Sequence, residues 1–156
     1  MDLETLLTTR VVIDELKSSD DQGAFQEIAE ALFGASIIGQ KDCVAIRDAF
    51  LARERVAATS LGFGMAVPHV FSEKVPSALL IVARSPAGVH MKSPDGRPTR
   101  LFFCLIANEA SRPAYLRILA AVAKVARDSY WRRCLDKANA TQVYDALIEG
   151  EKALGR

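Results

Sequence analysis

Histidine is the side chain that most readily accepts and returns a chemical group near neutral pH, and this chain has two of them. His69 ends the segment 59–69, TSLGFGMAVPH, directly after a proline. A phosphoryl group on an imidazole nitrogen can be passed on again if neighbouring donors hold the phosphate oxygens. The two glycines of the segment allow close backbone approach, and Thr59 and Ser60 add hydroxyl donors. From these residues alone, two interpretations stay open: a phosphoacceptor, and a strand-end histidine without a task.

Other catalytic patterns find less support. His90 lies beside a turn and is predicted to be a solvated strand residue. The run 62–64, GFG, lacks the third glycine of a dinucleotide fingerprint and the Gly-Lys-Ser/Thr of a nucleotide triphosphate loop. The chain contains no Gly-x-Ser-x-Gly elbow, and no carboxylate pair stands out for glycoside hydrolysis.

Two helices are predicted ahead of the histidine segment. Capping side chains at 18–21 precede apolar residues at helical spacing over 25–33, and Gly34 offers a stop. A second helix over 41–55 has one apolar face and ends in the charged run 53–55, Arg-Glu-Arg. This basic end is expected to point toward the segment that contains His69.

Strands are predicted in the middle of the chain. Glycine, β-branched and apolar residues over 57–70 indicate a turn with strands. The nearly continuous apolar runs 77–84 and 100–107 are typical of central strands covered on both faces. Between them, 89–91 is a possible short strand and 93–98, SPDGRP, is a turn.

The last third is predicted to be helical. Pro113 suits a first helical turn, and Asp128 and Asn139 can cap two further helices. The helix after Pro113 has two apolar stripes, which are Leu116, Leu119, Ala120 and Ala123, and Tyr115, Ile118, Val122 and Val125. Apolar residues on two faces predict packing against the sheet and beneath a neighbour as well.

This order of elements predicts an α/β fold: a single domain with a central mixed β-sheet flanked by helices on both sides.

Twenty basic residues against nineteen acidic ones provide no basic stripe for nucleic acid. The three cysteines are far apart and predicted to be buried reduced thiols, without a metal site or disulfide. The start of the chain lacks a leader pattern, and no apolar run approaches the ~18 residues needed to cross a membrane, so we expect a cytoplasmic protein.

The whole segment 53–69, RERVAATSLGFGMAVPH, resembles the signature of the EIIA type 2 domain of the bacterial phosphotransferase system. This is the mannitol and fructose class, which includes the nitrogen-regulatory EIIA proteins. The family pattern runs Arg-Glu, a Thr/Gly-rich turn, then an apolar residue, Ala, an apolar residue, Pro and His. The predicted elements follow the family's order over nearly the whole chain, so the resemblance implies one EIIA type 2-like domain over residues 1–156.

The resemblance implies that His69 accepts a phosphoryl group from the phosphorylated histidine-containing phosphocarrier protein and passes it on. It assigns Arg53 to steadying the phosphate, a role that suits the fork of a guanidinium group. Arg55 remains a possible substitute for Arg53. The hydroxyl groups of Thr59 and Ser60 are candidates to donate hydrogen bonds to the phosphate. Because the phosphoryl donor is itself a phosphohistidine, neither a metal nor an organic cofactor is expected.

The chain departs from the family pattern at two positions. Tyr115 stands where many members carry a second histidine, and its hydroxyl could bond the phosphate or orient His69, or the ring could simply pack. Phe63 stands where the family usually has a small or polar residue, and it could form a docking surface or cover the edge of the site.

We therefore predict a phosphotransferase that works through a phosphohistidine intermediate, in a regulatory role like that of the nitrogen branch. Its next partner would be a downstream regulatory target or an EIIB protein. The alternatives are a binding or sensor protein that keeps the EIIA fold without transfer, a sugar-specific fructose or mannitol EIIA, and a small-molecule hydrolase with His69 as its base.

Overall fold

The central strand β6 (Thr99–Ala107) organises the fold of residues 2–155, which the computed structural model describes. Its side chains alternate between two apolar layers. Phe102, Cys104 and Ile106 pack into one layer, and the neighbouring Leu101 and Phe103 pack into the other. Both faces are thus covered, which explains the unbroken apolar run and confirms the prediction of a central strand.

The sheet is mixed, as predicted. Its order is β1 (Val11–Ile13), β5 (Leu79–Val89), β6, β3 (Met65–Ala66) and β2 (Ser60–Gly62), while β4 (His69–Phe71) also pairs with β6. Strand β5 is antiparallel to β6, whereas β3 and β4 run parallel to β6 one after the other along its opposite edge. The candidate histidine therefore begins an edge segment of the sheet.

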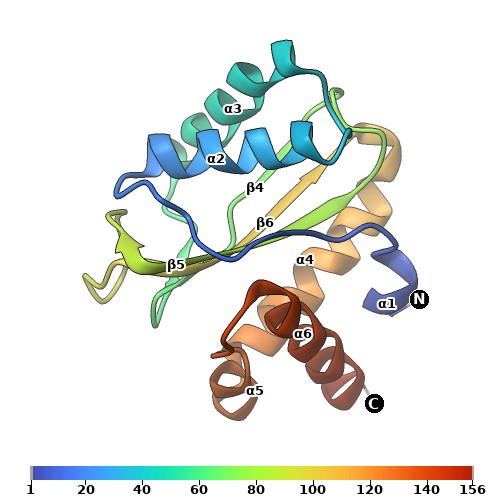
Figure 1. The fold of residues 1–156 in the computed structure, drawn as a ribbon. Helices are drawn as coiled ribbons and strands as arrows, with labels where there is room; N and C mark the ends of the chain where they lie inside the picture. The colour runs from blue at the N-terminus through green and yellow to red at the C-terminus, as the bar shows by residue number, and fades with distance from the viewer. Residues whose placement is uncertain (1, 156) are drawn as a thin grey trace.

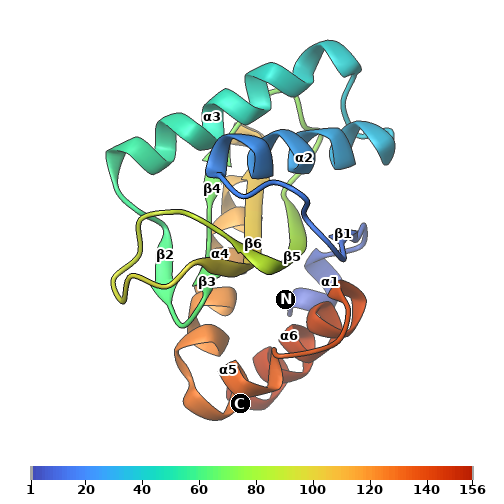
Figure 2. The same ribbon diagram turned by 60° about the vertical axis from the view of Figure 1, so that its left-hand side comes forward.

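Helices cover both faces of the sheet (Figures 1 and 2), which confirms the predicted fold class. On one face lie α2 (Asp21–Gly34) and α3 (Cys43–Val56), the latter preceded by the 3₁₀ turn η1 (Gln40–Asp42). On the other face lie α1 (Leu3–Leu6), α4 (Arg112–Arg127), α5 (Ser129–Cys134) and α6 (Ala140–Leu154), with the 3₁₀ turn η2 (Glu109–Ser111) before α4.

Three helices begin directly after the capping side chains from which their starts were predicted. Asp20 accepts a hydrogen bond from the Gly23 amide at 2.8 Å, ahead of α2. Asp128 accepts from the first amides of α5, and the Asn139 side chain accepts from the Gln142 amide of α6 at 2.9 Å. These bonds satisfy amides that have no partner within the helix.

The prediction of a second buried face on α4 is wrong. The stripe that contains Tyr115 and Ile118 is buried, but Leu116 is 52% exposed and Ala120 is exposed as well. Leucine and alanine are also the residues with high intrinsic helix propensity, so their presence on a helix does not require a covering neighbour.

Smaller differences concern the ends of elements. Strand β5 continues to Val89, and His90 forms only an isolated bridge with Asp20.

The cysteines are free, but only Cys43 and Cys104 are buried, whereas Cys134 is half-buried. Burial raises the pKa of the Cys104 thiol well above its ordinary value, so this thiol stays protonated.

Candidate functional site

The backbone around His69 is held on both sides. Pro68 has no amide hydrogen, and the ladder along β6 is interrupted there, between β3 and β4. The Pro68 carbonyl still accepts a hydrogen bond from the Leu105 amide at 2.8 Å, and His69 pairs with Leu105 in parallel register. On the other side, the Val67 amide donates to the Thr59 carbonyl at 3.0 Å. The histidine is therefore presented from a fixed edge of the sheet.

A backbone carbonyl determines the tautomer of His69. Its Nδ1 lies 2.7 Å from the carbonyl oxygen of Val67. A carbonyl oxygen only accepts, so Nδ1 must carry the hydrogen and donate it. In the neutral ring this leaves the lone pair on Nε2, which is then the nucleophilic nitrogen.

Arg53 faces that nitrogen. Its Nη2 lies 3.4 Å from His69 Nε2, and its Nη1 donates to the Ala57 carbonyl at 2.9 Å, just beyond the end of α3. One arm of the guanidinium group is thus anchored while the other reaches the ring. Arg55, the possible substitute, lies exposed on the same helical turn, so the geometry favours Arg53.

The hydroxyl groups of Thr59 and Ser60 are engaged elsewhere. Thr59 is buried, and both its hydroxyl and its amide donate to the Glu54 carboxylate, the amide at 3.2 Å. The Ser60 hydroxyl donates to the Met65 carbonyl and accepts from the Gly62 amide, both at 3.2 Å. These bonds hold the segment between α3 and β3. That either hydroxyl group donates a hydrogen bond to a bound phosphate stays a prediction.

Tyr115, on α4, is both a packed aromatic and a neighbour of the histidine. Its ring centroid lies 4.3 Å from that of Phe71 and 6.4 Å from that of His69. Desolvation raises the pKa of the Tyr115 phenol, although the charges of Arg53 and Arg112 act in the opposite direction. The phenol therefore keeps its proton at neutral pH and can donate, but it carries no positive charge.

Phe63 lies at the tip of the β2–β3 hairpin. The residue is 57% exposed, and the Arg132 guanidinium of α5 stacks over its ring at 3.8 Å. The backbone there is left-handed, with φ of 58° at Phe63 between glycines at 79° and 74°. The Phe63 amide donates to the Asp95 carboxylate at 2.8 Å. Phe63 thus contacts α5 and the turn before β6.

The sequence interpretation missed two groups. Glu54 fixes the loop through Thr59, and its only sequence signal is its place in the Arg-Glu pair of the signature. The Val67 carbonyl sets the tautomer, but a backbone atom leaves no signal in residue type.

Two further observations concern the described residues. Within residues 2–155, no three His, Cys, Asp or Glu side chains converge where they could hold a metal ion. None of the helices in the same range is both long and apolar enough to span a membrane.

Comparison with known proteins shows the family. The family model described as "Phosphoenolpyruvate-dependent sugar phosphotransferase system, EIIA 2" matches residues 5–150. A "Nitrogen regulatory protein" of Bradyrhizobium diazoefficiens is 30% identical over 128 residues, covering 82% of each chain. A "PTS system fructose-specific EIIA component" of Haloferax volcanii is 28% identical over 149 residues, covering 95% of this chain and 96% of that protein.

Solved structures share the fold. The nitrogen regulatory protein IIA-Ntr of Neisseria meningitidis superposes with a TM-score of 0.74 at 24% identity, covering 88% of this chain and 92% of that one. The mannitol IIA of Escherichia coli, solved in complex with its phosphorylated IIB, gives a TM-score of 0.68 at 18% identity, covering 94% and 95%. From the match over residues 5–150, this chain belongs to the EIIA type 2 family of the phosphoenolpyruvate-dependent phosphotransferase system.

Proposed function

We propose that His69 of this chain accepts a phosphoryl group on Nε2 from a phosphorylated histidine-containing carrier protein and passes it on. The observation that carries the proposal is the arrangement of the ring: Nδ1 is bonded to the Val67 carbonyl, and Nε2 faces the Arg53 guanidinium. Family membership supports the same role.

The transfer needs no cofactor. The Nε2 lone pair of His69 attacks the phosphorus of the donor phosphohistidine, the new N–P bond forms, and the donor N–P bond breaks with its electron pair returning to the donor imidazole. Nδ1 keeps its hydrogen throughout. Arg53 can hold the phosphoryl oxygens near Nε2, and such charge stabilisation is most of what a protein contributes to this reaction.

We propose further that the role is regulatory. The relative that reaches 30% identity is described as a nitrogen regulatory protein, whereas the fructose-specific relative is 28% identical. A regulatory chain that has been phosphorylated on His69 would keep its phosphoryl group when it is mixed with fructose-type and mannitol-type EIIB proteins. Rapid transfer of the phosphoryl group to either EIIB protein would instead indicate a role in sugar transport.

Phosphorylation tests the proposal directly. Incubation with labelled phosphoenolpyruvate, the first enzyme of the system and the phosphocarrier should give an acid-labile phosphate, which ³¹P NMR should assign to Nε2. The label should disappear in His69→Ala and persist in His90→Ala, a matched control because His90 is exposed and its amide bonds Ser19 in another part of the fold.

Absence of label on the wild type, under conditions that label a known EIIA, would support the sensor alternative. The observation that favours this alternative is Tyr115, which places a neutral phenol near His69, where the resemblance to the family pattern leads one to expect a second imidazole.

A further inference from the structure

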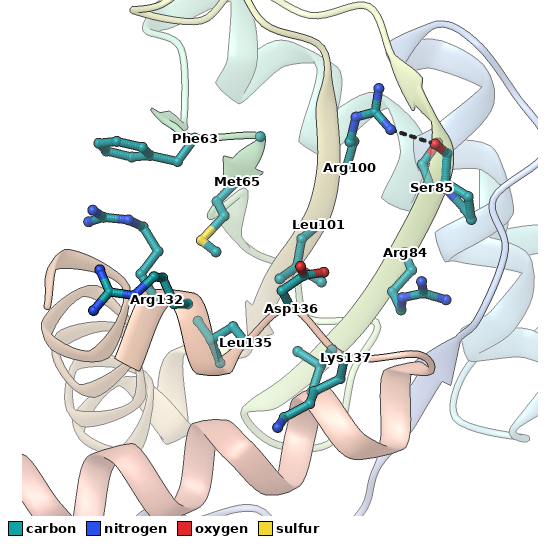
Figure 3. Close-up of a pocket in the computed structure, with 14 residues that line it drawn as sticks. Phe63, Met65, Arg84, Ser85, Arg100, Leu101, Arg132, Leu135, Asp136 and Lys137 are labelled. Atoms are coloured by element: carbon teal, nitrogen blue, oxygen red, sulfur yellow. Dashed lines mark hydrogen bonds between the residues drawn. The ribbon is translucent and has the colours of Figure 1, made fainter. Parts of the chain in front are cut away.

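A cavity of about 500 Å³ lies between the β2–β3 hairpin, the β5–β6 strands and the segment that joins α5 to α6 (Figure 3). Its lining includes neither His69 nor Arg53. Leu101 of β6 lines the cavity, and Leu105, the partner of His69, follows four residues later. At ~3.3 Å per strand residue, the two sites are about 13 Å apart along β6.

Positive charge is concentrated around this cavity. The lining contains five cationic side chains, which are Arg84, Arg100, Arg132, Arg133 and Lys137. Asp136 is the single acidic residue of the lining. The whole chain has a net charge of only +1, so a large local excess of positive charge faces this one cavity.

Carboxylates do not neutralise these cations. Arg100 donates to the Pro86 carbonyl at 2.8 Å and Arg84 to the Asp14 carbonyl at 3.2 Å, and both acceptors are uncharged. Within residues 2–155, none of the five cationic groups is paired with a carboxylate within 4.0 Å. Arg132 stacks over the Phe63 ring and donates to the carbonyls of Ala126 and Arg127 at 3.4 Å, and these groups are uncharged as well. The positive charges around the cavity are therefore not compensated by carboxylates.

The cations lie on two opposing walls. Figure 3 shows Arg84 and Arg100 on the side of the strands, with Arg132 and Lys137 on the side of the helices. The strand wall adds Ser85, which is only 1% exposed. Its hydroxyl accepts from the Gly88 amide at 3.1 Å, and its own hydrogen has no acceptor among the described residues.

Between the two walls the lining is apolar. Met65, Leu101, Leu135 and Val143 contribute buried side chains to it. Pockets of 300 to 1,000 Å³ that combine apolar walls with a few placed polar groups are typical of small-molecule sites.

We propose that this cavity binds a small organic phosphate that carries at least two phosphate groups. Guanidinium forks match phosphate oxygens, and cations on two walls suit separate phosphate groups of one ligand. The organic part would lie on the apolar residues between the walls. A volume of about 500 Å³ between two walls suits a small soluble molecule better than a flat macromolecular surface, and Asp136 limits the affinity by repulsion.

Calorimetry with metal-free ATP, pyrophosphate and orthophosphate tests the proposal. ATP should bind at least ~10-fold more tightly than orthophosphate and more weakly at high salt. In ¹H–¹⁵N NMR spectra, ATP should shift the amide signals of Met65, Ser85 and Leu101. The double variant Arg84→Gln/Arg100→Gln should bind ATP about 10- to 100-fold more weakly, since two charge-assisted contacts are lost.

Two further variants guard against trivial explanations. Asp136→Asn should tighten ATP binding by about 2- to 5-fold, a gain that misfolding cannot produce. Arg117→Gln, an exposed arginine of α4 outside the cavity lining, should leave binding unchanged. The proposal is overturned if ATP binds no more tightly than orthophosphate, if the shifts cluster at His69, or if Arg117→Gln weakens binding as much as the double variant. Binding to anionic lipid vesicles without binding to ATP would also overturn it.

Discussion

At His69 the two ring nitrogens have different tasks. The Val67 carbonyl accepts a hydrogen bond from Nδ1, and Nε2, the nitrogen that reacts in the proposed transfer, faces Arg53. The guanidinium group is already held by its bond to the Ala57 carbonyl, so the proposed transfer would need little rearrangement of Arg53.

Arg53→Gln should slow phosphorylation of His69 by about 10- to 100-fold, because a charge-assisted contact with the phosphoryl oxygens is lost. Arg53→Lys should recover part of the rate, since an ammonium group keeps the charge without the fork. Quench-flow measurement with labelled phosphocarrier gives the rates.

Arg55→Gln is the matched control for this prediction. Arg55 lies on the same turn of α3 but is exposed, so its loss should change the rate by less than about 2-fold. An equal loss of rate in both variants would show that the general charge of the helix end matters, and not the contact with Nε2.

The residue types of this site were predictable, but its hydrogen bonds were not. The signature over 53–69 leads to His69 and Arg53 because an imidazole and a guanidinium group stand at recognisable places in it. The same pattern left Arg53 and Arg55 as alternatives, since only the helical phase and the path of the following loop decide which one reaches the ring. It also suggested free hydroxyl groups at Thr59 and Ser60, whereas the fold uses both within the loop.

At the scale of elements, the β2–β3 hairpin connects the cavity lined by Arg84 and Arg100 with the candidate site at His69. The tip of the hairpin borders the cavity, and its second strand, β3, continues through Val67 and Pro68 to His69. The Gly64 carbonyl accepts from the amides of Arg100 and Leu101, at 2.8 and 3.0 Å, which ties the tip to the start of β6.

Gly64→Ala should lower the free energy of unfolding by about 1–2 kcal/mol, because an L-residue at φ 74° is strained. The added Cβ would lie 3.7 Å from its nearest neighbour, an ordinary contact, so backbone strain alone should account for the loss. Urea denaturation followed by circular dichroism measures the change.

Gly34→Ala provides the opposite case. Gly34 ends α2, has no positive φ, and a Cβ there would meet nothing within 4 Å. This variant should be neutral or more stable by up to about 1 kcal/mol. Destabilisation of the same size in both variants would contradict the explanation by backbone strain.

At the scale of the whole molecule, β6 joins the two apolar layers. Phe103→Ala should lower the free energy of unfolding by about 3–5 kcal/mol, because a fully buried ring on this central strand leaves a cavity. Leu116→Ala, at the exposed leucine of α4, should change it by no more than about 0.5 kcal/mol. A large loss of stability in Leu116→Ala would indicate that this leucine is covered in solution.

Most of the architecture follows from local signals. Capping residues and short apolar runs located α2, α3, α5, α6 and the strands β5 and β6, because these signals reflect hydrogen bonding and burial that each segment must satisfy. The short elements α1 and β1 were missed, since three or four residues carry little periodicity. The exposed face of α4 was misjudged because composition does not show whether a neighbour covers a helix.

The separate placement of the two histidines has a practical consequence for spectroscopy. The chain holds only two imidazoles, one at the edge strand β4 and one beyond the end of β5. In an NMR spectrum of the imidazole ring protons, His69 would respond to phosphoryl transfer while His90 stayed constant as an internal reference. The fraction of phosphorylated protein could then be followed in real time, without any introduced label.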